Sequence, residues 1–291
     1  MTDLTEIIRR LSRPLEPQPT GAEPRLPTLA GVRAVLFDVY GTLLISASGD
    51  ISLTSGVSRG DAAEEALAAA GVDLGQPGDR VAAALREVIE RRHRQSGHAF
   101  PEVDIAQVWR ETATLLTGGK VDLPDAAARR LAVEYECRVN PIWPMPGCAR
   151  VLAAIKGAGL PMGIVSNAQF FTPVAMEALL GGAVGGLGFD PSLCFWSYAA
   201  RQAKPGRPLY EAAAAALAGR GVQPAEVLYV GNDMLNDVWP AAAVGFQTVL
   251  FAGDARSLRL REGDPRVAGL TPSAVVTELP QLLTILSLAG G

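Results

Sequence analysis

Short apolar runs alternate with amphipathic stretches along most of this chain. The runs have the length and β-branched content of buried strands, and they lie at 32–37, 161–165, 193–196, 227–230, 247–251 and 273–276. The stretches between them place apolar residues three or four positions apart, which predicts helices at 147–158, 172–180, 208–219 and 238–244. Strands that alternate with helices indicate an α/β fold whose parallel sheet is covered on both faces.

The alternation is interrupted between residues 48 and 140, where the apolar positions follow the helical period alone. Four helices are predicted there, at 60–71, 77–95, 104–117 and 124–138. Near the N-terminus, a short amphipathic helix at 3–12 is followed by five prolines within 13–30, which favour extended chain. We therefore expect three parts: an N-terminal helix and Pro-rich arm (1–30), a sheet-containing core (31–47 with 141–291), and a helical insertion (48–140).

Composition narrows the class of protein. Hydrophobic residues make up 48% of the chain, enough for a sizeable core, and the net charge of −4 offers no general attraction for nucleic acid or an anionic membrane. The three cysteines, Cys137, Cys148 and Cys194, have no paired spacing, which disfavours a zinc site. Because no secretory signal or membrane-length apolar window is present, we expect a cytoplasmic protein with a small-molecule substrate. The oligomeric state stays open, with a homo-oligomer among the alternatives.

Polar residues gather where several predicted strands end. Asp38 ends the first apolar run and is followed by Gly41 and Thr42, while Ser166 and Asn167 follow the second. A Lys-Pro pair stands at 204–205, and an acidic loop at 231–237 follows another apolar run. Ligands bind at the carboxyl ends of parallel strands, so these groups converge if the strands are neighbours. A carboxylate nucleophile, a lysine and further carboxylates for Mg²⁺ would make a site for phosphoryl transfer.

Taken in order, these four segments resemble the motifs of the haloacid dehalogenase superfamily, in the branch with a helical cap between the first two motifs. The family's first motif is an Asp, any residue, usually a second Asp, and then Gly-Thr-Leu. The matching segments are Asp38-Val39-Tyr40-Gly41-Thr42-Leu43, Ser166 with Asn167, Lys204-Pro205, and Gly231 to Asp237. The resemblance covers about residues 31–280. It implies a Rossmann-like core with an inserted α-helical cap domain.

The resemblance also implies a role for each matching residue. Asp38 would be the nucleophile that forms a covalent aspartyl intermediate, and Lys204 would neutralise the charge shared by nucleophile and phosphate. The other implied catalytic residues are Tyr40, Thr42 and Ser166, with Gly41 and Asn167 as substrate contacts. The ligands of Mg²⁺ would be Asp38, the Tyr40 carbonyl, Asp233 and Asp237.

Two positions depart from the phosphatase pattern. Tyr40 stands where phosphatases of this family carry the Asp that protonates the leaving alkoxide, and a Tyr there resembles the L-2-haloacid dehalogenases, which need no metal. Asn232 stands where Mg²⁺-dependent members usually carry an Asp directly after the glycine, while Asp233 and Asp237 still form an acidic pair. The first motif thus favours a dehalogenase and the fourth a metal-dependent phosphotransferase.

From the sequence we expect a hydrolase, with a Mg²⁺-dependent phosphatase of a small phosphorylated metabolite as the leading hypothesis. It would act through an aspartyl-phosphate on Asp38. A metal-independent 2-haloacid dehalogenase is the second hypothesis, and a non-catalytic binding protein on the same scaffold is the third.

Overall fold

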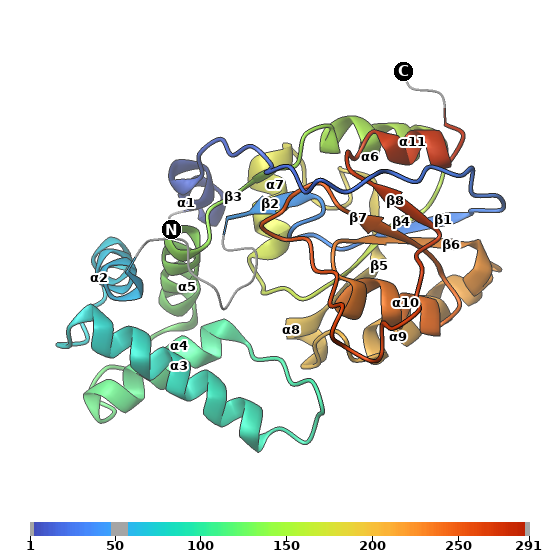
Figure 1. Ribbon diagram of the computed structural model, residues 1–291. Helices are drawn as coiled ribbons and strands as arrows, with labels where there is room; N and C mark the ends of the chain where they lie inside the picture. Colours follow the sequence, from blue (N-terminus) through green and yellow to red (C-terminus); the bar gives the residue numbers. More distant parts are fainter. Residues whose placement is uncertain (1–2, 48–57, 289–291) are drawn as a thin grey trace.

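The computed structural model describes residues 3–47 and 58–288. Within these residues, six parallel strands form the central sheet in the order β5-β4-β1-β6-β7-β8 (Figure 1). Their bounds are β1 Ala34–Phe37, β4 Met162–Ser166, β5 Phe189–Trp196, β6 Val227–Gly231, β7 Gln247–Phe251 and β8 Ala274–Val276. Numbered within this sheet alone, the order reads 3-2-1-4-5-6, which is the Rossmann order. The predicted fold class is confirmed.

The central strand β1 is buried on both faces, which explains its continuous apolar run. Val35 and Phe37 pack in the core under α6, α7 and α11, whereas Ala34 and Leu36 pack in the core under α9 and α10. These helices span α6 Cys148–Gly157, α7 Thr172–Leu180, α9 Pro208–Ala218, α10 Trp239–Ala243 and α11 Gln281–Ile285. The sheet is therefore the middle layer of three, as Figure 1 shows.

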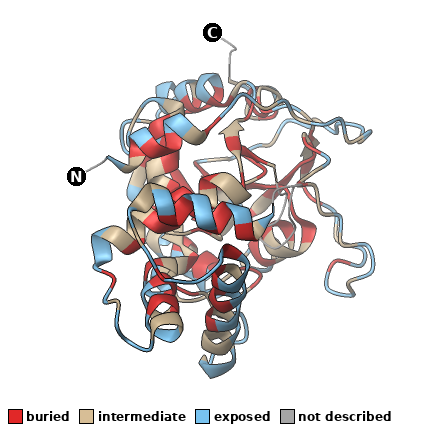
Figure 2. Cartoon of the chain, turned by 90° about the vertical axis from the view of Figure 1, so that its left-hand side faces the viewer, coloured by how far each residue is buried: buried red, intermediate tan, exposed pale blue. Residues whose placement is uncertain are grey.

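Four helices, α2 to α5, pack on one another beside the sheet (Figure 1). They span α2 Arg59–Ala70, α3 Gly78–Gln95, α4 Ile105–Thr117 and α5 Asp125–Val139, close to the expected bounds. Figure 2 shows buried (red) and exposed (pale blue) residues alternating along the helices of this view, as the helical period predicts. The part of the predicted insertion at 48–57 lies outside the described residues.

A short antiparallel strand pair stands where the chain leaves and re-enters the core. In it β2 (Leu44–Ser46) pairs with β3 (Ile142–Pro144), and Ser46 lies opposite Ile142. The helical segment α2–α5 therefore starts and ends at one place beside the sheet. The pattern of apolar positions did not predict this pair.

The N-terminal part lies against both the helical segment and the core. Helix α1 (Leu4–Leu11) packs on α5 and α7, burying Ile7 and Ile8, and Arg10 forms an ion pair of 2.7 Å with Glu134. The extended chain that follows runs to the sheet edge, where Arg25 bridges to Val275 of β8 (Figure 1). None of the helices in the described part of the chain combines the length and hydropathy that a membrane span requires.

One predicted helix begins earlier than expected. The helix expected at 238–244 is preceded by a π-helical turn, η2 (Met234–Val238), which runs directly into α10. Asp233 caps this turn, because its carboxylate accepts hydrogen bonds from the backbone N–H groups of Leu235 and Asn236.

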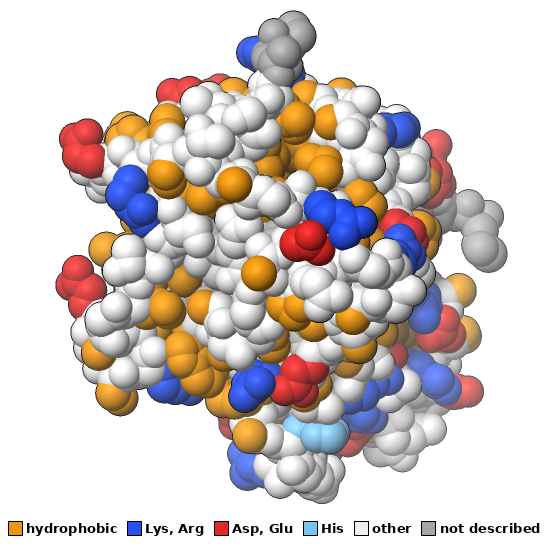
Figure 3. Space-filling view, turned by 90° about the vertical axis from the view of Figure 1, so that its right-hand side faces the viewer, with side chains coloured by type: hydrophobic (Ala, Val, Ile, Leu, Met, Phe, Trp, Pro, Cys, Tyr) orange, Lys and Arg blue, Asp and Glu red, His pale blue; other side chains and the backbone are white. Residues whose placement is uncertain are grey.

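The face of the molecule in Figure 3 carries both basic and acidic side chains, in keeping with the small net charge.

Candidate active site

The carboxyl ends of three neighbouring strands meet around one cavity of about 120 Å³. Asp38 follows β1, Asn167 follows β4, and the segment 232–237 follows β6. Lys204 reaches the same cavity from the loop between α8 (Ser197–Ala200) and α9. This is the switch point of the sheet, where the strand order reverses and ligands of such folds bind.

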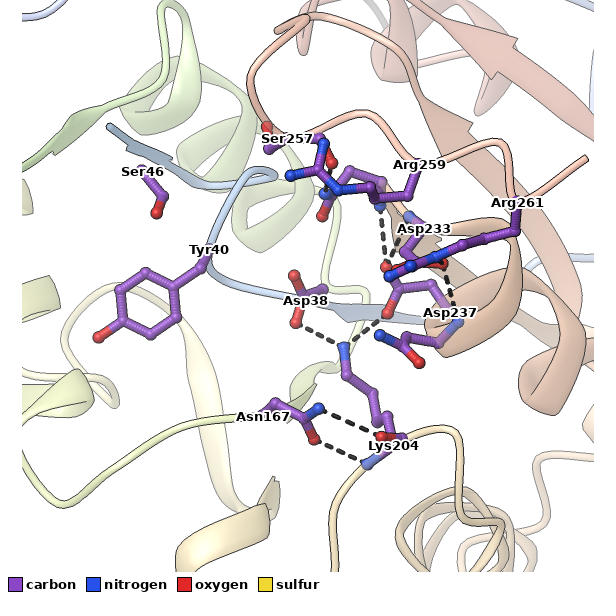
Figure 4. Close-up of a pocket in the computed structure, with 12 residues that line it drawn as sticks. Asp38, Tyr40, Ser46, Asn167, Lys204, Asp233, Asp237, Ser257, Arg259 and Arg261 are labelled. Atoms are coloured by element: carbon purple, nitrogen blue, oxygen red, sulfur yellow. Dashed lines mark hydrogen bonds and ion pairs between the residues drawn. The ribbon is translucent and has the colours of Figure 1, made fainter. Parts of the chain in front are cut away.

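Lys204 links the two carboxylates at the floor of this cavity (Figure 4). Its Nζ lies 2.7 Å from Asp38 Oδ1, 2.5 Å from Asp237 Oδ1 and 3.4 Å from the Tyr229 hydroxyl. Burial alone would lower the pKa of Lys204, but the charges of Asp237 and Asp38 raise it above its usual value. Lys204 therefore stays protonated, and the other oxygen of Asp38 points away from it (Figure 4).

Asn167 holds the backbone that carries this lysine. Its side-chain oxygen accepts a hydrogen bond from the Lys204 N–H at 2.7 Å, and its amide nitrogen donates to the Lys204 carbonyl at 3.3 Å. Asn167 thus positions the backbone of Lys204, and its contact with substrate stays a prediction.

Both oxygens of Asp237 already accept hydrogen bonds. Oδ1 faces Lys204 and lies 3.0 Å from the Tyr229 hydroxyl, and Oδ2 accepts from the N–H groups of Asn232 and Asp233, each at 2.9 Å. This arrangement requires Gly231, because a Cβ there would lie 2.4 Å from Asp237 Cγ. The carboxylate is thus folded back onto the end of β6.

Asp237 leads to an expected pH dependence. Burial raises its pKa to about 6, against the opposing effect of the Lys204 charge. Above pH 6 the ionised carboxylate holds Lys204, and below it the protonated group loses that charge pairing. We expect turnover to be constant from about pH 7 to 8 and to fall as the pH drops through about 6. In Asp237→Asn this inflection should be absent, and a flat wild-type profile down to pH 5 would contradict the assignment.

Asp233 is bound on two sides. Besides capping η2, its Oδ2 forms an ion pair with Arg261 Nη2 at 2.7 Å, and Arg261 Nε lies 3.2 Å from both of its oxygens. A planar guanidinium in this forked arrangement is a strong partner for a carboxylate. Asp233 therefore acts as a structural anion in this arrangement.

These contacts test whether the site fits Mg²⁺. A magnesium ion needs oxygens that it can approach to about 2.1 Å, and it keeps several waters. Asp233 is committed to Arg261 and to the helix cap, and Asp237 to Lys204 and two amides. Within 3–47 and 58–288, no three acidic, His or Cys side chains are grouped so that they could hold a metal ion. Asp233 and Asp237, two members of the predicted ligand set, therefore do not fit Mg²⁺ in this arrangement.

Tyr40 lines the cavity, but its hydroxyl lies away from Asp38 (Figure 4). The hydroxyl is 3.0 Å from Thr172 Oγ1 on α7. Burial, with a further contribution from the charge of Glu136, raises the pKa of Tyr40 well above its usual value. The phenol therefore stays protonated and is directed at a neighbouring helix.

For Tyr40→Phe we expect turnover to change less than about threefold, since the lost hydroxyl does not face the nucleophile. The free energy of unfolding should fall by about 1 kcal/mol, because the Thr172 hydroxyl loses a partner. Steady-state kinetics and urea unfolding measure the two effects, and Thr172→Val removes the same hydrogen bond together with the one that Thr172 accepts from the Gln169 N–H. A 100-fold loss of turnover in Tyr40→Phe would show that the hydroxyl takes part in the chemistry.

Three of the predicted site residues lie behind the cavity. Thr42 is fully buried and donates to Asn232 Oδ1 at 3.1 Å, and the Ser166 hydroxyl donates to the Asn167 carbonyl at 3.3 Å. Gly41 has φ of +81°, and a Cβ there would lie 2.6 Å from Ser257 Cβ. These contacts place Thr42 and Gly41 as supports of the Asp38 turn and Ser166 at the end of β4, and the predicted roles of all three toward substrate stay predictions.

Several residues that line the cavity were not predicted from the sequence: Ser46, Asn236, Ser257, Arg259 and Arg261. The arginines come from the loop after β7, beyond the last motif. Arg and Leu alternate at 258–261, and residue 259 bridges to Asp233 as a strand would. That alternation after a predicted strand was the signal available in the sequence.

The chain belongs to the haloacid dehalogenase-like hydrolase family, whose model matches residues 32–245. The predicted family and the hydrolase class are thereby confirmed. No sequence among the curated proteins matches the chain.

Solved structures with the same fold come from both branches of this family. A HAD phosphatase from Thermococcus onnurineus is 19% identical, with 89% of this chain and 100% of that chain covered and a TM-score of 0.51. A 2-haloacid dehalogenase from Pseudomonas syringae pv. Tomato DC3000 is 18% identical, with coverages of 88% and 98% and a TM-score of 0.54. The defluorinating L-2-haloacid dehalogenase Rha0230 is 20% identical, with coverages of 94% and 100% and a TM-score of 0.51. At these identities the likeness shows the fold.

Proposed function

We propose that this hydrolase is a metal-independent 2-haloacid dehalogenase in which Asp38 is the nucleophile. One observation carries the proposal: Asp233 and Asp237 are held by Arg261, Lys204 and backbone amides. The charge that a metal would neutralise is thus balanced by the protein's own cations. Asp38 keeps one carboxylate oxygen directed away from Lys204 (Figure 4).

The leaving group supports the same reaction class. An alkoxide needs a proton as it departs, and a positioned acid for that step typically contributes about 10²–10⁴-fold in rate. The Tyr40 hydroxyl, which replaces the acid of the phosphatases, faces Thr172 instead of the cavity floor. A halide leaves as a stable anion and needs no proton.

The reaction would proceed in two displacements. A carboxylate oxygen of Asp38 attacks C2 of the haloacid, so that a C–O bond forms while the C–halogen bond breaks and the halide departs with the electron pair. Water then adds to the carbonyl carbon of the resulting ester, and the acyl C–O bond breaks. This step releases a 2-hydroxy acid and one proton and restores Asp38. Lys204, bonded to the other oxygen, keeps the carboxylate oriented.

A Mg²⁺-dependent phosphatase is the second candidate. The observation that favours it is that Asp233 and Asp237 line the same cavity as Asp38. For those residues to bind Mg²⁺, Arg261 would have to release Asp233.

The test compares the two reactions on the purified protein. We expect halide release from 2-chloropropionate that is unchanged by EDTA, together with no EDTA-sensitive hydrolysis of p-nitrophenyl phosphate. Absence of halide release from chloro-, bromo- and fluoro-acids, combined with Mg²⁺-dependent phosphate release, would replace the proposal with the phosphatase.

A further inference from the structure

The loop after β7 is fixed against the segment that follows β6. The Arg259 N–H donates to the Asn232 carbonyl at 3.0 Å, and the Met234 N–H donates to the Arg259 carbonyl at 2.8 Å. Residue 259 thus lies beside Asp233 as an added piece of strand. Its backbone position relative to the cavity is set by the sheet.

The start of the loop is anchored separately. Asp254, only 1% exposed, accepts hydrogen bonds from the Gln18 N–H at 3.2 Å and from Arg256 Nε at 3.0 Å. Arg256 also donates to the Glu16 carbonyl of the N-terminal arm. The arm therefore helps to hold the loop that carries the two cavity arginines.

The middle of the loop packs directly on the turn of the nucleophile. The Asn232 side-chain amide donates to the Ser257 carbonyl at 2.6 Å, and Ser257 fills the space that a Cβ of Gly41 would need. Since Gly41 is three residues from Asp38, the loop and the nucleophile turn form one packed unit. The backbone of residue 259 is therefore held at a defined place relative to the turn of Asp38.

The two arginines differ in what they contact. Arg261 lies along the Asp233 carboxylate, whereas the Arg259 guanidinium lies beside Ser257 and donates through Nη1 to the Leu258 carbonyl at 3.0 Å (Figure 4). Both line the cavity. Arg259 is thus a second guanidinium in the cavity that holds Asp38.

We propose that Arg259 binds the carboxylate of the substrate and thereby restricts this enzyme to small anionic acids. The identity of the acid rests on the proposed function, but the anion contact itself does not. In a 2-haloacid the carboxylate carbon is bonded directly to the reacting carbon, so its binding group must share the small cavity with Asp38. A guanidinium presents two parallel N–H donors that match a carboxylate, whereas a lysine presents a single point of charge.

Calorimetric titration with propionate, which carries no leaving group, tests this contact without turnover. We expect wild type to bind propionate, Arg259→Met to bind it at least about 10-fold more weakly, and Arg259→Lys to fall between. Arg266→Gln is the matched control, because Arg266 lies in the same loop and pairs with Asp264 outside the cavity. Unchanged propionate affinity in both Arg259 variants would overturn the proposal.

Two further ligands test whether the site recognises the charge of the ligand and whether it prefers a carboxylate to a phosphate. Propionamide, the neutral analogue, should bind wild type and Arg259→Met equally. Inorganic phosphate should bind more weakly than propionate, and binding of phosphate without binding of propionate would overturn the carboxylate assignment.

In kinetics with 2-chloropropionate, Arg259→Lys should raise KM more than it lowers kcat. A wild type that binds propionate through Arg259 but releases no halide would remove the proposed reaction and leave the anion site standing.

Discussion

Replacing Asp38 with Asn is expected to lower halide release by about 10⁴-fold or more, because an amide oxygen is a far weaker nucleophile than a carboxylate. The two side chains have the same shape, and the Asn oxygen still accepts a hydrogen bond from Lys204. Halide release measured at saturating substrate reports the loss, and urea unfolding confirms that the variant is folded.

Asp264→Asn is the matched control for this change. It makes the same carboxylate-to-amide substitution in an ion pair with Arg266, outside the cavity, and should leave turnover unaltered. Turnover in Asp38→Asn within 10-fold of wild type would contradict a nucleophilic Asp38. A non-catalytic binding protein, the third hypothesis from the sequence, would show no turnover in wild type or in Asp38→Asn.

Replacing Lys204 with Met is expected to lower both activity and stability. Asp38 and Asp237 would then lie buried beside each other without their shared cation, and breaking a buried pair in this way costs about 3–5 kcal/mol. Turnover should fall at least about 100-fold, since the nucleophile loses the cation that orients it and balances its charge. Urea unfolding at pH 7 and halide release measure the two effects.

The pH dependence of this variant has a definite sign. Without Lys204, the folded-state pKa of Asp237 rises further, so the stability loss is largest well above that pKa and shrinks as the pH falls and a carboxylate is protonated. Lys204→Met combined with Asp237→Asn removes one of the two facing charges and should recover part of the lost stability at pH 7. Equal stability of Lys204→Met and wild type at pH 7 would contradict the buried charge network.

The inner strands of the central sheet could be predicted from the sequence because they are buried on both faces, whereas of the edge strand β5 only residues 193–196 were predicted. In β6 and β7 this burial gives nearly continuous apolar runs bounded by glycine and polar residues. Strands β2 and β3 could not be predicted, because each has three residues and its partner lies about a hundred positions away. Helix η2 begins early because Asp233 caps it, and the sequence alone did not separate a capping Asp from a metal-binding one.

The same limit applies to the candidate site. Asp38, Asn167, Lys204 and Asp237 could be placed together because they follow strands or precede a helix at the edge where parallel strands end. The sequence does not show which residue pairs with each of these charged side chains. Arg261 reaches Asp233 from 28 positions further along the chain, through a loop with no motif of its own. That contact turns an apparent metal ligand into half of an ion pair.

The origin of the oxygen in the product tests the role of Asp38 most directly. A single turnover with enzyme in excess over 2-chloropropionate, run in water enriched in ¹⁸O, is followed by mass spectrometry of the peptide that contains Asp38 and of the 2-hydroxy acid. Attack of Asp38 on carbon followed by ester hydrolysis predicts ¹⁸O in the Asp38 carboxylate and unlabelled oxygen in the product. Label in the 2-hydroxy acid, with none in the Asp38 peptide, would contradict the account.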